Sequence, residues 1–360
     1  MKILFIGNCS PKSTSLQRFN WMRQLGHDIA AVDSNRFFPF TYQLPLWKRV
    51  ENRLGIGPSF LALNRQVLAA AQVSSCDLLW VEKGVHLFPQ TLAACRKYCS
   101  SLASFHLDDP FTRRGSKGWR HHLAGMSYYD VLFVSKKAVA LDCLQRGARC
   151  VYETFSGYDP HLHRPVTRDL PIPALSGSVI FIGHYEAERE RFLEAVLNVT
   201  PHLFVSSWGW EKCRSTKLRQ AGVLHCEGLW GDDYAAALSQ AGIALGLLTR
   251  NHRDLHTSRS FEIPACGGFM LAERTVEHLL LFQEGVEAEF FADLVEMVDK
   301  VKYYLAHPDE ARAIGQRGRQ RCLESGYGYD KCIPRWLEFA MNPRGRMRSD
   351  FELLVQGKAP

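Results

Sequence analysis

The sequence predicts an α/β protein made of two doubly wound, Rossmann-like domains that face each other across a cleft, followed by a C-terminal helical segment. Three observations support this. Short apolar runs alternate with helical periodicity along the 360 residues, as in parallel sheets covered on both faces. The opening pattern, an apolar strand closed by a glycine at 2–7, returns at 179–183. Between the two halves, residues 165–178 are rich in proline, glycine and serine, which is typical of a linker.

In the first half, apolar runs predict strands at 2–6, 29–33, 77–81, 101–107, 131–134 and 151–155. Apolar residues at helical spacing predict helices near 16–25, 61–71, 89–99 and 136–146. Residues 36–60 fit this alternation poorly. They contain several aromatic and basic side chains, including Trp47 and Arg49, and are interpreted as a partly helical insertion.

The second half repeats the alternation, with strands predicted at 179–183, 202–206, 223–225 and 243–247 and helices at 188–196, 233–240, 292–306 and 308–325. We expect an N-terminal domain at 1–168, a C-terminal domain at 177–332, and a helical segment at 333–360 that packs back on both. Hydrophobic content of 46% and the length are ample for two separate cores.

Composition narrows the classes of function. The formal net charge of +7 is modest and spread out, which favours an anionic substrate and does not require nucleic acid. Eleven cysteines without a CxxC pair indicate free thiols in a reducing compartment. No apolar run reaches the roughly 18 residues needed to span a bilayer. We therefore expect a cytoplasmic protein, and Lys48, Arg49 and Arg53 are compatible with peripheral contact at the inner membrane face.

The most informative stretch is 257–271, which reads as a short helix with a polar start, a glycine turn and a buried strand. Arg259 and Glu262 are three residues apart and share a helix face. A cation beside a helix start suits a diphosphate, and a carboxylate can accept hydrogen bonds from adjacent sugar hydroxyls. This predicts a nucleotide-sugar clamp that includes the N–H groups of Thr257, Ser258 and Ser260. An ordinary turn with a solvent-exposed ion pair is the alternative.

Other residue patterns argue against a metal site and against several common nucleotide-binding or catalytic motifs. His252 and His256 are four residues apart, and His161 and His163 are close, but neither pair has a third ligand at metal spacing. We therefore expect no metal. The GxGxxG, GxxxxGK[ST] and GxSxG patterns are absent from the sequence, so dinucleotide, P-loop and serine-hydrolase interpretations lose their usual support.

Several motifs together resemble the CgeB-like (spore maturation protein type) glycosyltransferases, within the GT-B superfamily similar to glycosyltransferase family 4. The matching stretches are R-x-F-E-I-P-A-C-G-G at 259–268, Glu273, F-x-x-G at 282–285, Y-Y-L-A-H-P at 303–308, D-D-P at 108–110, G-Y-D-P at 157–160 and F-I-G at 181–183. The resemblance covers most of residues 77–330 and is strongest at 257–307.

The resemblance implies a GT-B fold, with an acceptor held by the N-terminal domain and a nucleotide-sugar donor, UDP- or GDP-linked, held by the C-terminal domain. It implies catalysis in the cleft without metal or other cofactor. Related retaining enzymes carry two acidic residues eight apart before a small-small-Cys-Gly turn. Glu262 takes the second position, which binds the donor ribose. Asp254 takes the first, where the family has Glu.

Glycosyl transfer requires stabilisation of the leaving diphosphate, so cations near it matter most. Besides Arg259, the candidates are His184 and Arg189, which follow the turn at Gly183. A loop residue and a surface charge are the respective alternatives. Trp208 and Trp210 follow a predicted strand and could stack on the nucleotide base or pack in the core.

On the acceptor side, His106, Asp108 and Asp109 follow a predicted strand, where ligands of open α/β sheets gather. One of them could act as base or orienter for the acceptor hydroxyl, or the carboxylates could cap the turn before Pro110. For acceptor contacts the candidates are Asn8, Ser10, Glu82 and Lys83, with a helix cap and an ion pair as the respective alternatives.

The leading hypothesis is thus a metal-independent, retaining glycosyltransferase that transfers a sugar from a nucleotide donor to a hydroxyl acceptor, which could be a glycan, a lipid or a protein. An NAD-dependent oxidoreductase is one rival, although Cys9 and Tyr185 occupy the positions where a second glycine is expected. A non-catalytic nucleotide- or carbohydrate-binding protein is the other, and Asp254 in place of Glu favours it.

Overall fold

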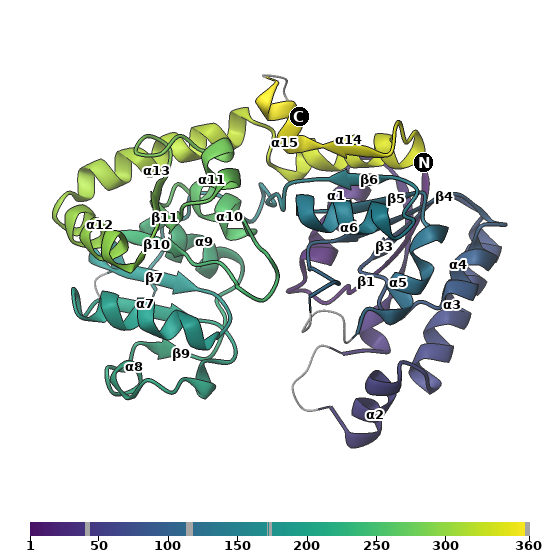
Figure 1. Cartoon of the computed structure of the whole chain (residues 1–360), viewed down its shortest axis with the longest axis horizontal. Coiled ribbons are helices and arrows are strands. Elements are labelled where there is room, and N and C mark those ends of the chain that lie inside the picture. Colours follow the sequence, from purple (N-terminus) through teal and green to yellow (C-terminus); the bar gives the residue numbers. More distant parts are fainter. Residues whose placement is uncertain (40–43, 113–117, 171, 173–174, 357–360) are drawn as a thin grey trace.

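The computed structural model describes residues 1–39, 44–112, 118–170, 172 and 175–356 (Figure 1). Residues 40–43 of the predicted insertion and residues 171, 173 and 174 of the predicted linker lie outside the described residues. The described chain forms two parallel sheets with helices on both faces, so the predicted α/β class with two doubly wound domains is confirmed.

The first sheet has seven parallel strands in the order β13-β6-β5-β4-β3-β1-β2. Their bounds are β1 (Lys2–Gly7), β2 (Asp28–Asp33), β3 (Cys76–Glu82), β4 (Cys99–His106), β5 (Val131–Val134), β6 (Val151–Glu153) and β13 (Met347–Ser349). The helices of this half are α1 (Thr14–Gln24), α2 (Leu46–Leu54), α3 (Pro58–Ser74), α4 (Pro89–Cys95), α5 (Arg120–Gly125) and α6 (Lys137–Gln145).

Both faces of this sheet are covered, which explains why its strands are apolar runs rather than alternating ones. Leu63 and Val67 of α3 belong to the core on one face, with residues of α4 and α6. Trp21 of α1 and Trp336 of α14 (Tyr329–Met341) belong to the core on the opposite face. Strand β1 sits between β2 and β3, with Ile3 aligned to Leu78.

The second sheet has six parallel strands in the order β12-β11-β10-β7-β8-β9. Their bounds are β7 (Val179–Ile182), β8 (Leu203–Ser206), β9 (Leu224–His225), β10 (Ile243–Gly246), β11 (Met270–Glu273) and β12 (Glu289–Phe291). The helices are α7 (Ala187–Leu197), α8 (Thr216–Gln220), α9 (Gly231–Gln240), α10 (Arg259–Ala265), α11 (Val276–Leu281), α12 (Leu294–Ala306) and α13 (Pro308–Glu324).

The C-terminal segment contains more than the predicted helix. After α14 crosses the first sheet, residues Met347–Ser349 form β13 on the edge strand β6, and α15 (Asp350–Val355) follows (Figure 1). Asp350 anchors this strand, because its buried carboxylate accepts hydrogen bonds from the Tyr152 hydroxyl at 2.6 Å and the Thr154 hydroxyl at 2.8 Å. A three-residue strand is too short to show a sequence period, which is why the pattern missed it.

The chain crosses between the domains twice, and the two crossings lie side by side. Tyr158 and Gly328 form a parallel bridge, and the Tyr329 N–H donates to the Tyr158 carbonyl at 2.9 Å. Arg253 adds a contact across the cleft, with its Nε 2.5 Å from Asp109 and its Nη2 2.7 Å from Asp142. The domains are therefore connected by backbone pairing on one side and by ion pairs on the other.

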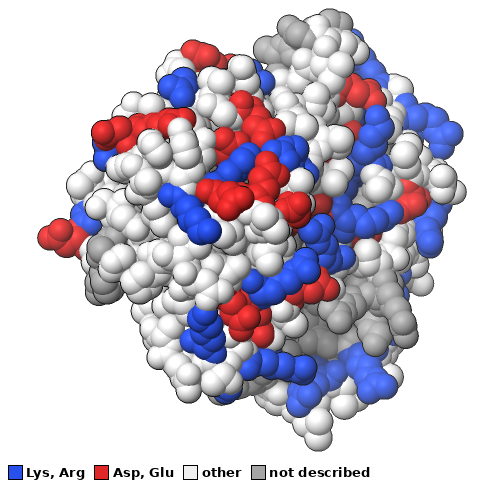
Figure 2. All heavy atoms as spheres, turned by 60° about the vertical axis from the view of Figure 1, so that its left-hand side comes forward, with Lys and Arg blue, Asp and Glu red and all other residues white. Residues whose placement is uncertain are grey.

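On the face shown in Figure 2, Lys and Arg side chains are more frequent toward the right and the lower edge, and Asp and Glu side chains toward the upper left. No helix among the described residues has the length and apolar character needed to cross a bilayer. All eleven cysteines lie in described segments and none forms a disulfide.

Candidate functional site

Three adjoining cavities lie at the carboxyl ends of the two sheets, where open α/β folds place their ligands. The central cavity, about 550 Å³, lies between the domains and is walled by the loop after β1, the loops after β7 and β8, and α10. The inner cavity, about 420 Å³, adjoins it at His184 and residues 258–259. The outer cavity, about 1030 Å³, extends into the first domain. It meets the central cavity at loop 83–86 and the inner cavity at Asp108 and His252.

Arg259 and Glu262 both line the central cavity, one turn apart on α10. They do not form the ion pair that the alternative interpretation expected. Arg259 donates its Nε–H to the carbonyl of Ile182, and within the described residues no carboxylate lies at ion-pair distance from its guanidinium. Because α10 has only seven residues and a proline inside, its macrodipole is small, and Arg259 supplies most of the local positive charge.

Glu262 is held in place by two aromatic side chains that the sequence analysis missed. The Tyr234 hydroxyl donates to its Oε2 at 2.6 Å. His163 Nδ1 accepts from the Asp159 N–H at 3.1 Å, so its Nε2 carries the proton and lies 3.8 Å from Oε1 of Glu262. Burial first, and Glu262 second, raise the pKa of Tyr234, so the hydroxyl stays a donor. The carboxylate is thus oriented toward the cavity with lone pairs to spare.

Of the polar side chains at the start of α10, some face the cleft and one is buried in the core. Ser258 lines the central and inner cavities, and Thr257 lines the inner one. Ser260 is buried instead: its hydroxyl accepts from the Thr257 N–H at 3.0 Å and lies 2.8 Å from His278 Nε2. The prediction that the Ser260 N–H belongs to the clamp is corrected, because that N–H donates to the Thr257 carbonyl at 3.0 Å. The Thr257 N–H is likewise used within the protein, by the Ser260 hydroxyl.

Aromatic side chains form a ledge on one wall of the central cavity. His184 stacks on Trp208 with ring centroids 5.6 Å apart, and Trp208 lies 5.4 Å from Trp230. The amine of Lys12, from the loop after β1, lies 5.3 Å from the Trp230 ring. All four residues line the central cavity. Trp230 and Lys12 were not predicted.

Trp210 does not belong to this ledge, and the prediction is corrected. It is fully buried in the core of the second domain, and its indole N–H donates to the Gly183 carbonyl at 2.9 Å. Two residues earlier in the chain, Trp208 takes the exposed position. Gly183 itself lines the inner cavity, with its backbone fixed by that bond and by its own N–H donating to Ser206 at 3.0 Å.

Arg189 and His184 both line the inner cavity, but the guanidinium of Arg189 bonds mainly to other groups of the protein. Its guanidinium donates to the carbonyls of His184 at 2.5 Å and Leu247 at 3.4 Å, and lies 3.2 Å from Glu186. It therefore shapes the loop that carries His184. Burial, and then the nearby cations Arg259 and Arg189, lower the pKa of His184, so this imidazole is neutral near pH 7.

Asp254 lines the inner cavity and is paired across the cleft. Its Oδ1 lies 2.9 Å from Nζ of Lys136, and both side chains are largely buried. Burial raises the pKa of Asp254, and Lys136 opposes that shift. Lys136 follows strand β5, at the same sheet edge as the predicted candidates, and lines the inner cavity too. The pair joins the two domains at the floor of the site.

The three predicted residues after β4 separate in space. His106 is 1% exposed, packs against Trp119 and His122, and lines none of the three cavities. Burial lowers its pKa to about 4, so it stays neutral. We remove it from the candidate catalytic residues. Asp109 is also fully buried, accepts from the Phe111 N–H at 2.9 Å and pairs with Arg253, which makes it a structural cap.

Asp108 alone of the three faces ligand space, lining the inner and outer cavities. Its Oδ2 lies 2.6 Å from Nζ of Lys83, and that cation holds the pKa of the carboxyl well below its usual range. Lys83 has φ of +63°, a conformation that costs a non-glycine residue about 1 kcal/mol or more. Strain of this kind concentrates at functional sites.

The remaining acceptor-side candidates all line the central cavity. Asn8 Oδ1 accepts from the Ser10 N–H at 2.8 Å, which folds the first loop into a turn. Glu82 pairs with Arg18 at 2.6 Å, both side chains being buried. The expected ion pair of Glu82 with Lys83 is absent from the described residues, because each has a closer partner of its own.

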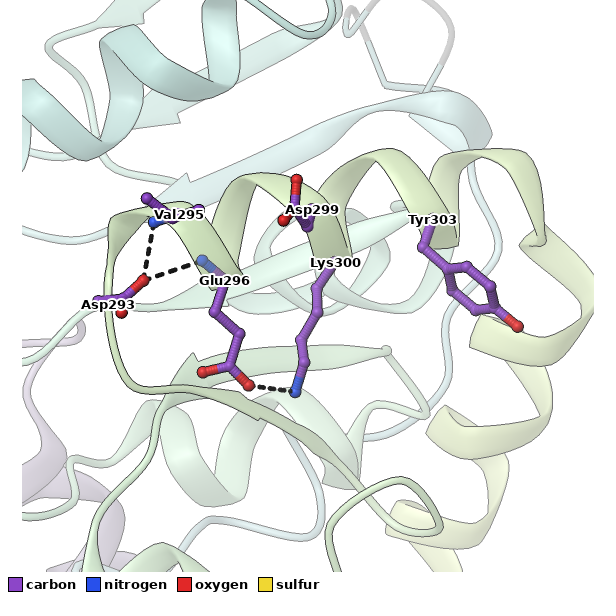
Figure 3. Close-up of a pocket in the computed structure, with 6 residues that line it drawn as sticks. All are labelled: Asp293, Val295, Glu296, Asp299, Lys300 and Tyr303. Atoms are coloured by element: carbon purple, nitrogen blue, oxygen red, sulfur yellow. Dashed lines mark hydrogen bonds and ion pairs between the residues drawn. The ribbon is translucent and has the colours of Figure 1, made fainter.

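A further hollow lies far from the cleft, along one exposed face of α12 (Figure 3). Its side chains satisfy one another: Asp293 accepts from the N–H groups of Val295 and Glu296, and Glu296 lies 3.0 Å from Lys300. We regard it as a capped surface helix. Within the described residues, no group of three or more His, Cys, Asp and Glu could hold a metal ion.

Comparison with known proteins relates one segment of the chain to a family and the whole chain to solved folds. Residues 189–338, less than half of the chain, match the family model described as "Glycosyl transferase-like". That segment holds Arg259, Glu262 and Trp208. No curated protein matches the sequence.

Three solved structures illustrate the similarity of fold. HepE from Anabaena, in complex with UDP and glucose, has 13% identity and a TM-score of 0.64, covering 94% of this chain and 99% of its own. Sucrose-phosphate synthase from Thermosynechococcus elongatus has 11% identity and a TM-score of 0.65, covering 94% and 98%. A UDP-forming α,α-trehalose-phosphate synthase from Burkholderia vietnamiensis has 13% identity and a TM-score of 0.63, covering 95% and 97%.

At these sequence identities the solved structures establish the fold alone. The family model indicates in addition that one segment of the chain is glycosyltransferase-like. The chain has the GT-B fold, and its residues 189–338 form a glycosyltransferase-like segment.

Proposed function

We propose that the protein is a glycosyltransferase that takes a sugar from a nucleoside diphosphate donor and transfers it to a hydroxyl acceptor. The charge balance of the central cavity carries this proposal. Arg18 is neutralised by Glu82, and Lys83 by Asp108. Among the described residues, Arg259 and Lys12 line the same cavity without an acidic partner. With the carboxylate of Glu262, which lines the cavity too, these groups leave an excess of one positive charge, which favours an anionic ligand such as a diphosphate.

The aromatic ledge supports the nucleoside half of this assignment. Trp208 and Trp230 line the central cavity, and every nucleobase stacks favourably on aromatic ring faces. Glu262 lies one turn after Arg259 on α10 and lines the same cavity, and its carboxylate is an acceptor for the vicinal hydroxyls of a ribose. Base, ribose and diphosphate thus each have a complementary group.

We place the donor sugar in the inner cavity, which adjoins the diphosphate position at Arg259. The bond between the sugar and the diphosphate breaks as the acceptor oxygen bonds to the sugar, and the departing diphosphate takes up the proton of the acceptor hydroxyl. Arg259, with neutral His184 beside it, stabilises the negative charge that develops on the diphosphate. Asp254, held by Lys136, can orient the sugar hydroxyls. The resemblance to retaining enzymes makes retention of configuration the expected outcome. No metal is needed, because Arg259 and Lys12 take the role of a cation.

Asp108 is our candidate for orienting the acceptor hydroxyl. With its pKa held low by Lys83, it is ionised at neutral pH and accepts a hydrogen bond without being a strong base. The names of the structural neighbours favour uridine: HepE was solved with UDP and with UDP-glucose, and the Burkholderia vietnamiensis enzyme is UDP-forming. We propose a UDP-sugar donor first and a GDP-sugar second.

A thermal-shift panel of UDP, GDP, ADP, CMP, dTDP and NAD tests the proposal. A ligand at 100 times its dissociation constant stabilises the folded state by about 2.7 kcal/mol, which such a panel detects. We expect one nucleoside diphosphate to raise the unfolding midpoint and Glu262→Gln to abolish most of the shift. A midpoint raised by NAD alone would instead favour the oxidoreductase.

The chain provides a matched control for Glu262. Glu289 is similarly buried, 6% exposed against 8%, and also accepts a hydrogen bond from a tyrosine, Tyr304, at 2.6 Å. It lies outside the three cavities. Glu289→Gln therefore keeps the nucleotide shift if the effect is local to the site. Equal loss in both variants would mean that Glu262 acts on the fold and not on the ligand.

Nucleotide binding without any sugar transfer or donor hydrolysis would favour a non-catalytic binding protein, the alternative that Asp254 in place of Glu suggests. Release of free UDP from UDP-sugars, measured with and without added carbohydrate acceptors, separates the two. We expect slow hydrolysis by wild type and none by Arg259→Gln.

A further inference from the structure

Helix α2 presents its apolar side chains to solvent. Leu46, Val50 and Leu54 are four residues apart and form one stripe, with Trp47 beside it and Ile56 just beyond the helix end. Their exposed fractions are 74% for Leu46, 55% for Trp47, 48% for Val50, 57% for Leu54 and 58% for Ile56.

A carboxylate beside this stripe holds the helix against the protein. Glu51 is 4% exposed, and its Oε1 accepts from the Ser59 N–H at 2.5 Å, at the start of α3. Gly55 closes the helix in the left-handed conformation with φ of +62°. The orientation of α2 is therefore fixed by Glu51, with the acidic side inward and the apolar side outward. This is the reverse of an ordinary surface helix.

Charge around the stripe has one sign. Residues 44–66 contain Lys48, Arg49, Arg53 and Arg65, and Glu51 is the single acid. Since Glu51 is buried, the charged side chains on the solvent side of this segment are all basic. No ion pair involves any of these four basic side chains within the described part of the chain. Lys48 extends over Trp47, with its amine 5.3 Å from the ring.

We propose that the exposed face of α2, defined by Leu46, Trp47, Val50, Leu54 and Ile56 with its flanking basic residues, docks the protein on an anionic membrane surface. An amphipathic helix of this kind buries its apolar side chains at the head-group boundary, and its Lys and Arg side chains pair with anionic lipids.

The charge argues against a second copy as the occupant. In a two-fold dimer the same patch faces itself, so Arg49 and Arg53 of one subunit would meet those of the other, and the segment has no exposed acid to offset them. An anionic bilayer supplies both the apolar environment and the missing negative charge.

The position of the outer cavity agrees with this surface. Asn52, Arg53 and Gly55, at the end of α2, line one end of the cavity, and Lys83, Asp108 and His252 line the other. A head group at the bilayer would thus enter beside α2 and reach the residues that adjoin the donor site. This argument depends on the proposed function; the argument from α2 does not.

Co-sedimentation with vesicles tests the proposal on the full chain. We expect the wild-type protein to sediment with vesicles of phosphatidylglycerol and phosphatidylcholine and to stay in the supernatant with phosphatidylcholine alone. Arg49→Gln/Arg53→Gln should bind about 25-fold more weakly, because each basic residue near an anionic surface contributes a factor of about five. Trp47→Gln/Leu54→Gln should lose binding at least as strongly.

Matched controls come from the second domain. Val276 and Val295 are 67% and 71% exposed apolar residues on α11 and α12, so Val276→Gln/Val295→Gln changes as much exposed apolar surface elsewhere. It should bind vesicles like wild type. Equal sedimentation of wild type with both kinds of vesicle, or equal losses in the control and α2 variants, would overturn the proposal.

Two further measurements separate the alternatives. Light scattering should show a monomer, and a dimer that Trp47→Gln/Leu54→Gln dissociates would assign the face to a second copy and overturn membrane docking. The nucleotide-induced thermal shift should be unchanged in that variant. Vesicle binding without any nucleotide shift would remove the proposed function and leave membrane docking standing.

Discussion

Replacing Arg259 by glutamine tests the assignment of the diphosphate position. The change removes the charge and keeps a side-chain amide that can still donate toward the Ile182 carbonyl, so the loop after β7 should keep its shape. Hydrogen bonds to charged groups contribute about 1.5–3 kcal/mol, and Arg259 has no carboxylate partner among the described residues to reduce that value. We therefore expect UDP to bind about 10- to 150-fold more weakly.

Comparing UDP, UMP and uridine by calorimetry locates the loss. If Arg259 binds the diphosphate, Arg259→Gln should weaken UDP strongly, UMP less, and uridine hardly at all. Arg164→Gln is the control, because Arg164 is an exposed arginine of the same region, 3.0 Å from Asp232, and lines none of the cavities. The reasoning is refuted if UDP affinity changes less than about twofold, or if uridine loses as much as UDP.

Three other changes should separate site residues from structural ones. Lys136→Met leaves Asp254 buried without its partner, so we expect the free energy of unfolding to fall by about 2 kcal/mol. Adding Asp254→Asn should restore part of that loss, and fully additive effects of the two changes in chemical denaturation would contradict the pairing. Trp208→Ala should weaken nucleotide binding by about 1–3 kcal/mol, the usual contribution of stacking on one base. Trp210→Phe should lower the stability of the fold and leave the nucleotide affinity unchanged, and the reverse pattern would exchange the two roles. Burial lowers the pKa of His278 to about 4, below its unfolded value near 6.5, so its stabilisation is complete above about pH 6.5 and falls by about 2 kcal/mol by pH 5. His278→Gln should flatten the urea-midpoint profile over this range, and an unchanged slope would contradict it.

The fold was largely predictable because its signals are local. Buried parallel strands read as apolar runs, and the repeated strand-glycine opening at 2–7 and 179–183 marked the two domains before any contact was known. The missed elements, such as α11 and β13, are too short to show a period. The insertion contained α2 as expected, and its basic and aromatic residues were compatible with membrane contact, but the pattern did not predict which side chains of the helix face outward.

The sequence predicted at which edge of each sheet the site lies, but it predicted the individual site residues less well. Strand ends identify the right loops, yet beyond the last strand residue the strand's period of two no longer predicts which way a side chain points: His106, the last residue of β4, is buried, whereas Asp108, two residues later, lines the cavities. The same holds for Trp210 and Trp208. The ligand-facing partners of Glu262, Tyr234 and His163, come from α9 and from the first crossing between the domains, and only tertiary structure joins them.

The structure of the protein bound to the nucleotide chosen by the thermal-shift panel tests the central claim most directly. The account predicts the base on the ring faces of Trp208 and Trp230, the ribose hydroxyls on Glu262 and the diphosphate on Arg259 and Lys12. A nucleotide bound elsewhere, for example along the loop after β1 alone or against α12, would contradict the assignment of the central cavity as the donor site.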